Sequence, residues 1–249
     1  MAKLLPHTWT VPERFRARLG AQAGRQRAML HEGHLLLVLH DLPGSTETAR
    51  RASFFWRAPD GAWKSTGAVA KGGAVALRAH VEAFTAAAQA LEERVEKATR
   101  AAEYFAVLQE VAPALRAARN MHKALQDARE GCPDDKDLIT IRDQAYDNER
   151  ALDLIQADAK NGLEFTVAKR AEEQAELSDE ISRSGHRLNL LVALFLPISA
   201  LGGVLGINLE HGFEHAHAPW LFWTIVAAAF LVGLLVRAGV SGGSKARAG

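Results

Sequence analysis

The sequence predicts a mainly helical α+β membrane protein: a small N-terminal α/β domain, long antiparallel coiled-coil helices, and a two-helix transmembrane hairpin. Two apolar segments near the C-terminus, Leu188–Ile207 and Pro219–Val236, contain no charged residue. The length of each is close to the roughly twenty residues that cross a bilayer. Before them, from about Ala74, the chain is rich in Ala, Glu, Leu and Arg, with apolar residues at heptad spacing. The predicted parts are a small cytoplasmic α/β domain at 1–73, long cytoplasmic helices and a stalk at 74–187, a first transmembrane helix at 188–207, an extracytoplasmic loop at 208–218, a second transmembrane helix at 219–237 and a cytoplasmic tail at 238–249.

The N-terminal domain is expected to contain two β-hairpins, because short apolar runs flank turns that contain glycine. The first hairpin joins Ala28–Leu30 to His34–His40, and the second joins Ser53–Arg57 to Ala62–Thr66. The uninterrupted apolar run within His34–His40 predicts a strand that is covered on both faces. Pro12–Gln26, rich in Arg and Ala, is expected to be a covering helix.

Two long helices should follow the N-terminal domain. The first is expected to run from Ala74 to about Arg129 with a kink or restart at Pro113, since proline removes a backbone donor. The second should begin near Asp135 and continue into the bilayer, because no proline interrupts it before Pro197. Its apolar seam is Leu138, Ile141, Ala145, Asn148, Leu152, Ile155 and Ala159. Such a helix needs a packing partner, which is the first helix, other copies of itself, or both.

The distribution of charged residues predicts the orientation of the transmembrane hairpin. The loop between the two apolar segments has no Lys or Arg, whereas basic residues flank both segments on the other side, as the positive-inside rule requires of cytoplasmic flanks. These basic residues are Arg183, Arg187, Arg237, Lys245 and Arg247. We therefore expect a multi-pass protein of the inner (plasma) membrane with both termini cytoplasmic. Cys132 is the single cysteine, so no intramolecular disulfide can form.

Composition and motifs argue against two other classes of protein. A net charge of +1 with 24% charged residues shows no concentrated basic face, so a nucleic-acid binder is not expected. An enzyme is not expected either, and no cofactor is predicted, because the sequence has no phosphate-binding loop, no dinucleotide-binding glycine turn and no His-Glu-x-x-His metal motif.

The end of the first apolar segment carries the most specific motif. Residues Leu196–Asn208, ending in Gly206-Ile207-Asn208, resemble the end of the first membrane helix of the CorA-type divalent cation transporters, which is marked by Gly-X-Asn, usually Gly-Met-Asn. The order of the predicted parts is also similar: a soluble domain, long helices, a first span, a short acidic loop and a second span with a basic tail.

The resemblance implies a homopentamer whose first membrane helices line a central pore and conduct divalent cations, driven by the membrane potential. Gly206, Ile207 and Asn208 would form the selectivity filter, where Asn208 carbonyls bind the hydration water that Mg²⁺ holds tightly. Ser199 would supply a second polar ring, whereas Leu188, Val192 and Leu196 would form an apolar constriction able to gate by excluding water. Gly203 would line the pore and allow close helix packing.

The predicted outer loop and the stalk carry further charged and metal-binding residue types. Glu210 and Glu214 could concentrate cations at a pore mouth. A possible Zn²⁺ site consists of His211, His215 and His217, although their spacing fits no closed tetrahedral motif and a solvated loop is the alternative. Five stalk acids would form an acidic vestibule if they faced the pore, with a solvated helix face as the alternative; they are Glu172, Glu173, Glu176, Asp179 and Glu180.

Three functions remain open from the sequence. Mg²⁺ is the first choice of transported ion, with Zn²⁺, Co²⁺ and Ni²⁺ as alternatives. A Zn²⁺ transporter that resembles ZntB is favoured by Ile207, which replaces the common Met of the motif. A membrane-anchored coiled-coil scaffold that does not conduct is the third reading. The lipid bilayer and other copies of the chain are the expected partners.

Overall fold

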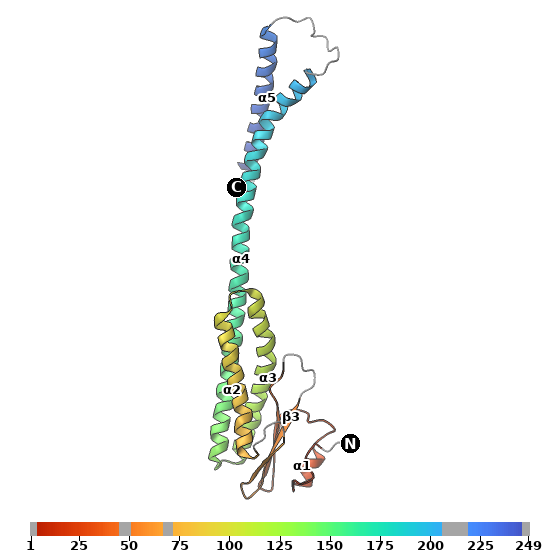
Figure 1. Cartoon of the computed structure of the whole chain (residues 1–249), viewed down its shortest axis with the longest axis vertical. Helices are drawn as coiled ribbons and strands as arrows, with labels where there is room; N and C mark the ends of the chain where they lie inside the picture. The colour runs from red at the N-terminus through yellow and green to blue at the C-terminus, as the bar shows by residue number, and fades with distance from the viewer. Residues whose placement is uncertain (1–3, 45–50, 67–71, 206–218, 246–249) are drawn as a thin grey trace. The chain divides into compact units, whose positions relative to one another are not determined.

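The computed structural model describes residues 4–44, 51–66, 72–205 and 219–245 (Figure 1). The chain divides into unit 1, Met1–Lys169, and unit 2, Arg170–Gly249. Within unit 1 the elements are α1 (Glu13–Ala17), β1 (Arg27–His31), β2 (His34–His40), β3 (Ala52–Arg57), β4 (Trp63–Ser65), α2 (Ala74–Lys97) and α3 (Ala101–Gly131). The long helix α4 (Lys136–Leu205) begins in unit 1 and ends in unit 2, which also contains α5 (Pro219–Lys245).

The four strands form one antiparallel sheet in the order β1-β2-β3-β4, which confirms both predicted hairpins. Glu32 and Gly33 make the first turn with positive φ values of 48° and 75°, the conformation that a tight hairpin loop requires at both positions. Among the described strands none pair in parallel, so the domain expected as α/β has the antiparallel meander of an α+β fold.

Strand β2 is covered on both faces, as predicted, and Leu35–Leu39 are completely buried. Leu35, Leu37 and Leu39 pack into the core formed with α2 and α3, whereas Leu36 and Val38 pack against the N-terminal segment. Much of that segment is irregular, so the predicted helix over Pro12–Gln26 is wrong outside Glu13–Ala17. A helix cannot pass Gly24, which has a φ of 72°.

The first long helix is not continuous, which corrects the prediction of a single helix from Ala74. The backbone of Ala98 is extended, and α3 restarts at Ala101. The Glu103 carboxylate accepts hydrogen bonds from the backbone N–H groups of Thr99 and Arg100, at 2.9 and 3.0 Å, and so caps the new helix. Hydrogen bonds from the Thr99 N–H, the Arg100 guanidinium and the Arg100 N–H, in this order of importance, lower the pKa of Glu103 to about 2. Pro113, where the break was expected, lies inside α3.

Helix α4 packs in unit 1 through the seam predicted for it. All seven seam residues are buried: Leu138, Ile141, Ala145, Asn148, Leu152, Ile155 and Ala159. In α2 the heptad seam of the first helix is buried at Leu77, Val81, Phe84, Ala88 and Leu91. Beyond the interruption the same spacing leads to Phe105, which is 54% exposed because the interruption changes the rotational phase of the pattern. In α3 the buried stripe instead includes Val107, Val111, Ala118, Met121 and Leu125.

Candidate functional site

The residues predicted to line a pore lie on one face of α4 within unit 2. Leu188, Val192 and Leu196 are 61%, 50% and 63% exposed. Ser199 is exposed as well, and a Cβ added at Gly203 would meet no atom within 4 Å. Steps of three and four residues keep these five positions on one side of a helix. We call them the α4 stripe: Leu188, Val192, Leu196, Ser199 and Gly203.

Helix α5 packs on the side of α4 that is opposite the α4 stripe. A Cβ added at Gly233 would lie 2.8 Å from the carbonyl oxygen of Leu194, so the two backbones approach closely there. Leu194 is two residues beyond Val192, which places it roughly 160° away around the helix. Ala229 and Gly233 are the buried positions of α5 whose side chains are described. The α4 stripe is therefore left open by the described residues of unit 2.

The predicted filter and outer loop cannot be placed. Gly206, Ile207, Asn208, Glu210, His211, Glu214, His215 and His217 all lie outside the described residues. Across the described ranges, no group of three or more His, Cys, Asp or Glu side chains is arranged to hold a metal ion. No helix has the combined length and apolar character of a membrane span where the structure is described.

Most of the stalk acids face away from the line of the α4 stripe. Ile181 lies seven residues before Leu188 and so continues the stripe, with its side chain 72% exposed. Glu172, Glu176 and Asp179 are roughly 140–180° around the helix from Ile181 at about 100° per residue. Asp179 is also paired with Arg183 at 3.2 Å. These positions favour a solvated face over an acidic vestibule.

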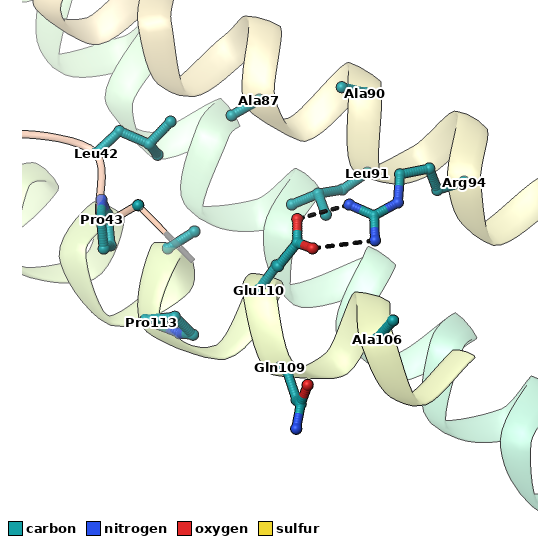
Figure 2. A pocket seen from close by; sticks show the side chains of 12 residues that line it. Leu42, Pro43, Ala87, Ala90, Leu91, Arg94, Ala106, Gln109, Glu110 and Pro113 are labelled. Carbon is teal, nitrogen blue, oxygen red and sulfur yellow. Dashed lines mark hydrogen bonds and ion pairs between the residues drawn. The ribbon is translucent and has the colours of Figure 1, made fainter. Parts of the chain in front are cut away.

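A hollow of about 330 Å³, not expected from the sequence, lies between α2, α3 and the chain after β2 (Figure 2). At one end Arg94 donates two hydrogen bonds to the Glu110 carboxylate, at 2.6 and 3.1 Å, and this bonding raises the pKa of Arg94. The rest of the described lining is mostly small or apolar, including Leu42, Ala87, Ala90, Ala106 and Ala114. Since its charged side chains are already paired, the hollow has little with which to recruit a charged ligand.

His80 of α2 is buried against the sheet, with its side chain only 6% exposed. Its ring lies against Phe55 and Phe84, with centroid separations of 5.5 and 5.9 Å. The His80 Nδ1 atom is 3.7 Å from Asp41 Oδ1, which accepts a hydrogen bond of 2.7 Å from the Ser53 hydroxyl. Among the described atoms, His80 Nε2 is buried without a hydrogen-bond partner. Burial lowers the pKa of His80 from its ordinary 6.5, and the attraction of Asp41 opposes this only in part.

A buried polar network joins α2 to α4 one turn further along. The Asn148 side chain donates to the Val81 carbonyl at 3.0 Å, and its oxygen accepts from the Thr85 hydroxyl at 2.8 Å. Gln144 Nε2 lies 3.3 Å from the same hydroxyl. The sequence placed Asn148 in the seam but gave it no partner. His80 was missed, although its position three residues after Leu77 placed it on the buried side of α2.

Comparison with known proteins shows the fold. No protein-family model and no curated protein matches the chain. The structure of full-length CmaX matches with a TM-score of 0.53 and 14% identity, covering 91% of this chain and 82% of CmaX. The ZntB cytoplasmic domain from Vibrio parahaemolyticus RIMD 2210633 matches with a TM-score of 0.52 and 14% identity, covering 66% of this chain and 80% of that domain. The CorA magnesium transporter from Methanocaldococcus jannaschii has a TM-score of 0.40 and 12% identity, over 87% of this chain and 78% of that one, too low to support an argument. The chain therefore shares the fold of CmaX and of the ZntB cytoplasmic domain.

Proposed function

We propose that the chain is one subunit of a homopentameric channel in the inner (plasma) membrane that conducts divalent cations, with Mg²⁺ as the first choice. The main support is the α4 stripe, whose side chains are exposed in the single chain and lie opposite the α5 contact. Exposed apolar residues in a continuous line on a helix mark an interaction surface. Copies of α4 brought together through this face would place the stripe around a common axis.

The sequence beyond the described part of α4 supports conduction along that axis. The stripe leads toward Gly206-Ile207-Asn208, the motif in which the chain resembles the CorA-type transporters. In the proposal, five Asn208 carbonyls form a neutral ring that binds hydrated cations, and the Ser199 hydroxyls form a second ring. Leu188, Val192 and Leu196 form the apolar gate between that ring and the cytoplasm. Sharing a fold with CmaX and the ZntB cytoplasmic domain agrees with this assignment.

The membrane segments of the proposal rest on the sequence. Leu188–Ile207 is uncharged, and Pro219–Val236 is uncharged and apolar, but the first extends past Leu205, where the described part of the helix ends. With both termini cytoplasmic, the membrane potential drives a dication inward. Each charge that crosses 100 mV gains about 2.3 kcal/mol, so the proposal needs neither a cofactor nor an ATP site.

Zn²⁺ is the second candidate ion. It is favoured by the His and Glu residues of the predicted outer loop, which are ligand types that Zn²⁺ accepts, and by Ile207 in place of Met. Co²⁺ and Ni²⁺ are further candidates for the same path.

The test is cation uptake into proteoliposomes that contain the full chain, with Mg²⁺ and Zn²⁺ measured in parallel under an inside-negative potential. Asn208→Ala should lose most of the uptake or its selectivity. The control Asn161→Ala removes the same side chain from an exposed position of α4 in unit 1 and should leave uptake unchanged.

Two results would overturn the proposal. The mass of the detergent-solubilised complex should correspond to five chains, whereas a dimer excludes a central ring of Asn208. If an intact pentamer carries neither ion, the chain is a membrane-anchored scaffold.

A further inference from the structure

We propose that His80 is a proton-sensitive latch, which holds α2 against the sheet while its imidazole is neutral and releases α2 when the imidazole gains a proton. The inference concerns unit 1 alone and is independent of whether the chain conducts cations.

The site of His80 is built for a neutral ring. The imidazole lies between Phe55 and Phe84 and is almost completely buried. A protonated imidazole has two N–H donors and needs an acceptor for each. A hydrogen bond with the His40 backbone favours the protonated ring, and Asp41 Oδ1 lies 3.7 Å from Nδ1, but Nε2 has no acceptor among the described atoms. A charged ring left in this position would therefore be poorly solvated.

The groups around His80 do not compensate for this burial. The end of β2 contributes His40, whose imidazole is hydrogen-bonded to the Gly24 carbonyl at 2.8 Å, and Asp41 follows it. From β3 come the neutral Ser53 hydroxyl and the Phe55 ring, and the Ser53 hydroxyl already occupies Asp41 Oδ1. Positive charge on His40 would further disfavour a proton on His80. Asp41 is thus the one nearby anion in the described environment, and its attraction is weaker than the effect of burial.

The latch lies beside the network that attaches α2 to α4. Val81, the next residue of α2, accepts a hydrogen bond from Asn148 through its carbonyl, and Thr85 donates to the same side chain. Movement of α2 away from the sheet at His80 would therefore strain the Asn148 network within unit 1. Protonation of His80 would in this way weaken the hydrogen bonds that attach α2 to α4.

The direction of the pH effect follows from the lowered pKa of His80. With α2 released, the imidazole is exposed and titrates near its ordinary 6.5, so the released form binds a proton first as the pH falls. Relative to the released form, the latched form therefore has its full stability above pH 6.5 and becomes less stable as the pH falls below 6.5.

The experiment is hydrogen exchange, read by mass spectrometry, on the detergent-solubilised full chain. It is run at pH 7.5 and 5.5, about one pH unit above and below the ordinary histidine pKa of 6.5. Exchange times are scaled for the intrinsic pH dependence of amide exchange. In the wild type, the peptides that cover α2 should lose protection several-fold at the lower pH. His80→Phe keeps an aromatic ring between Phe55 and Phe84 and should remove this loss. The control His7→Gln removes an exposed imidazole from unit 1 and should leave the loss intact.

Two further measurements keep the test decisive. Asp41→Asn removes the nearby anion, so the loss of protection at pH 5.5 should increase. If His80→Phe does not fold, the imidazole signals of the wild type are followed by NMR, and His80 should titrate below its ordinary 6.5. The latch is excluded if His80→Phe keeps the same acid-induced exchange in α2, or if His80 titrates at or above its ordinary 6.5.

Discussion

In both halves of α4, apolar residues recur at steps of three and four residues, but the two faces that they form differ in burial. In unit 1 the seam from Leu138 to Ala159 is buried by the helices and strands of the same chain. In unit 2 the α4 stripe from Leu188 to Gly203 is exposed, although its steps are also three or four residues. The spacing marks an apolar face of the helix, and only the rest of the fold shows whether the same chain buries it.

The contrast also separates intrachain stability from assembly. Truncating a buried seam residue should destabilise each chain, because it leaves a cavity in a packed core. Truncating a stripe residue should affect only the contacts between copies. The predictions below test this division from the largest effect to the smallest.

Leu152→Ala should destabilise unit 1 by about 3 kcal/mol, since the side chain is completely buried and its removal leaves a cavity. Leu188→Ala, at the 61% exposed position, should cost at most about 0.5 kcal/mol in the single chain but lower the fraction of oligomer. Urea unfolding and native mass measurements on both variants give the two quantities. Equal losses of unfolding free energy would remove the distinction between the two halves of α4.

Asn148→Ala should cost about 1–3 kcal/mol, because the Val81 carbonyl and the Thr85 hydroxyl would lose their buried partner. Asn161→Ala on the same helix is exposed and should change stability by less than about 0.5 kcal/mol. Urea unfolding measures both. A cost below that of the control would mean that the network adds nothing to the attachment of α2.

Gly162→Ala should destabilise unit 1 by about 1–3 kcal/mol, because the added methyl group would overlap the Tyr104 ring. Gly185→Ala is its matched control in unit 2, since nothing lies within 4 Å of the added Cβ. There the substitution should stabilise the helix by up to about 1 kcal/mol. Thermal unfolding distinguishes the two, and a destabilised Gly185→Ala would show that another copy covers this position in the assembly.

Glu103 should give the smallest effect, confined to the start of α3. Its folded-state pKa is lowered from 4.5 to about 2, so the stability that it contributes is present above pH 4.5 and is lost as the pH falls toward 2. Glu103→Gln should remove this part of the pH dependence and increase fraying at Ala101. Amide NMR of the first turn of α3 reports both, and an unchanged acid titration in the variant would assign the effect to another carboxyl group.

The sequence was sufficient for the strands and for the seam of α4, because both depend on local apolar periodicity. It failed at Ala98–Arg100, where the chain turns without a glycine or proline. The available signal was Glu103, three residues after the N-cap, in the position of a capping box. The kink or restart was expected at Pro113, because proline is a strong local signal for a helix break. Pro113 instead lies inside α3, where the packing of the helix tolerates it.

The candidate site could be predicted only as a line of residues along a helix. The α4 stripe is exposed, and Asn208 and the outer loop lie outside the described residues, so the pore lining and the filter stay predictions. Spacing placed His80 on the buried side of α2 but could not show its surroundings, because Asp41 and Phe55 are distant in sequence and are brought near it by the sheet.

The shape of the sheet limits how copies of the chain can associate. The edge strand β4 has only three residues, and its central Lys64 is exposed, with its ammonium group 5.2 Å from the Trp56 ring centroid. A short edge that presents a charge is a poor template for β-augmentation by another polypeptide. The β4 edge of the sheet is thereby protected from pairing with a strand of another polypeptide.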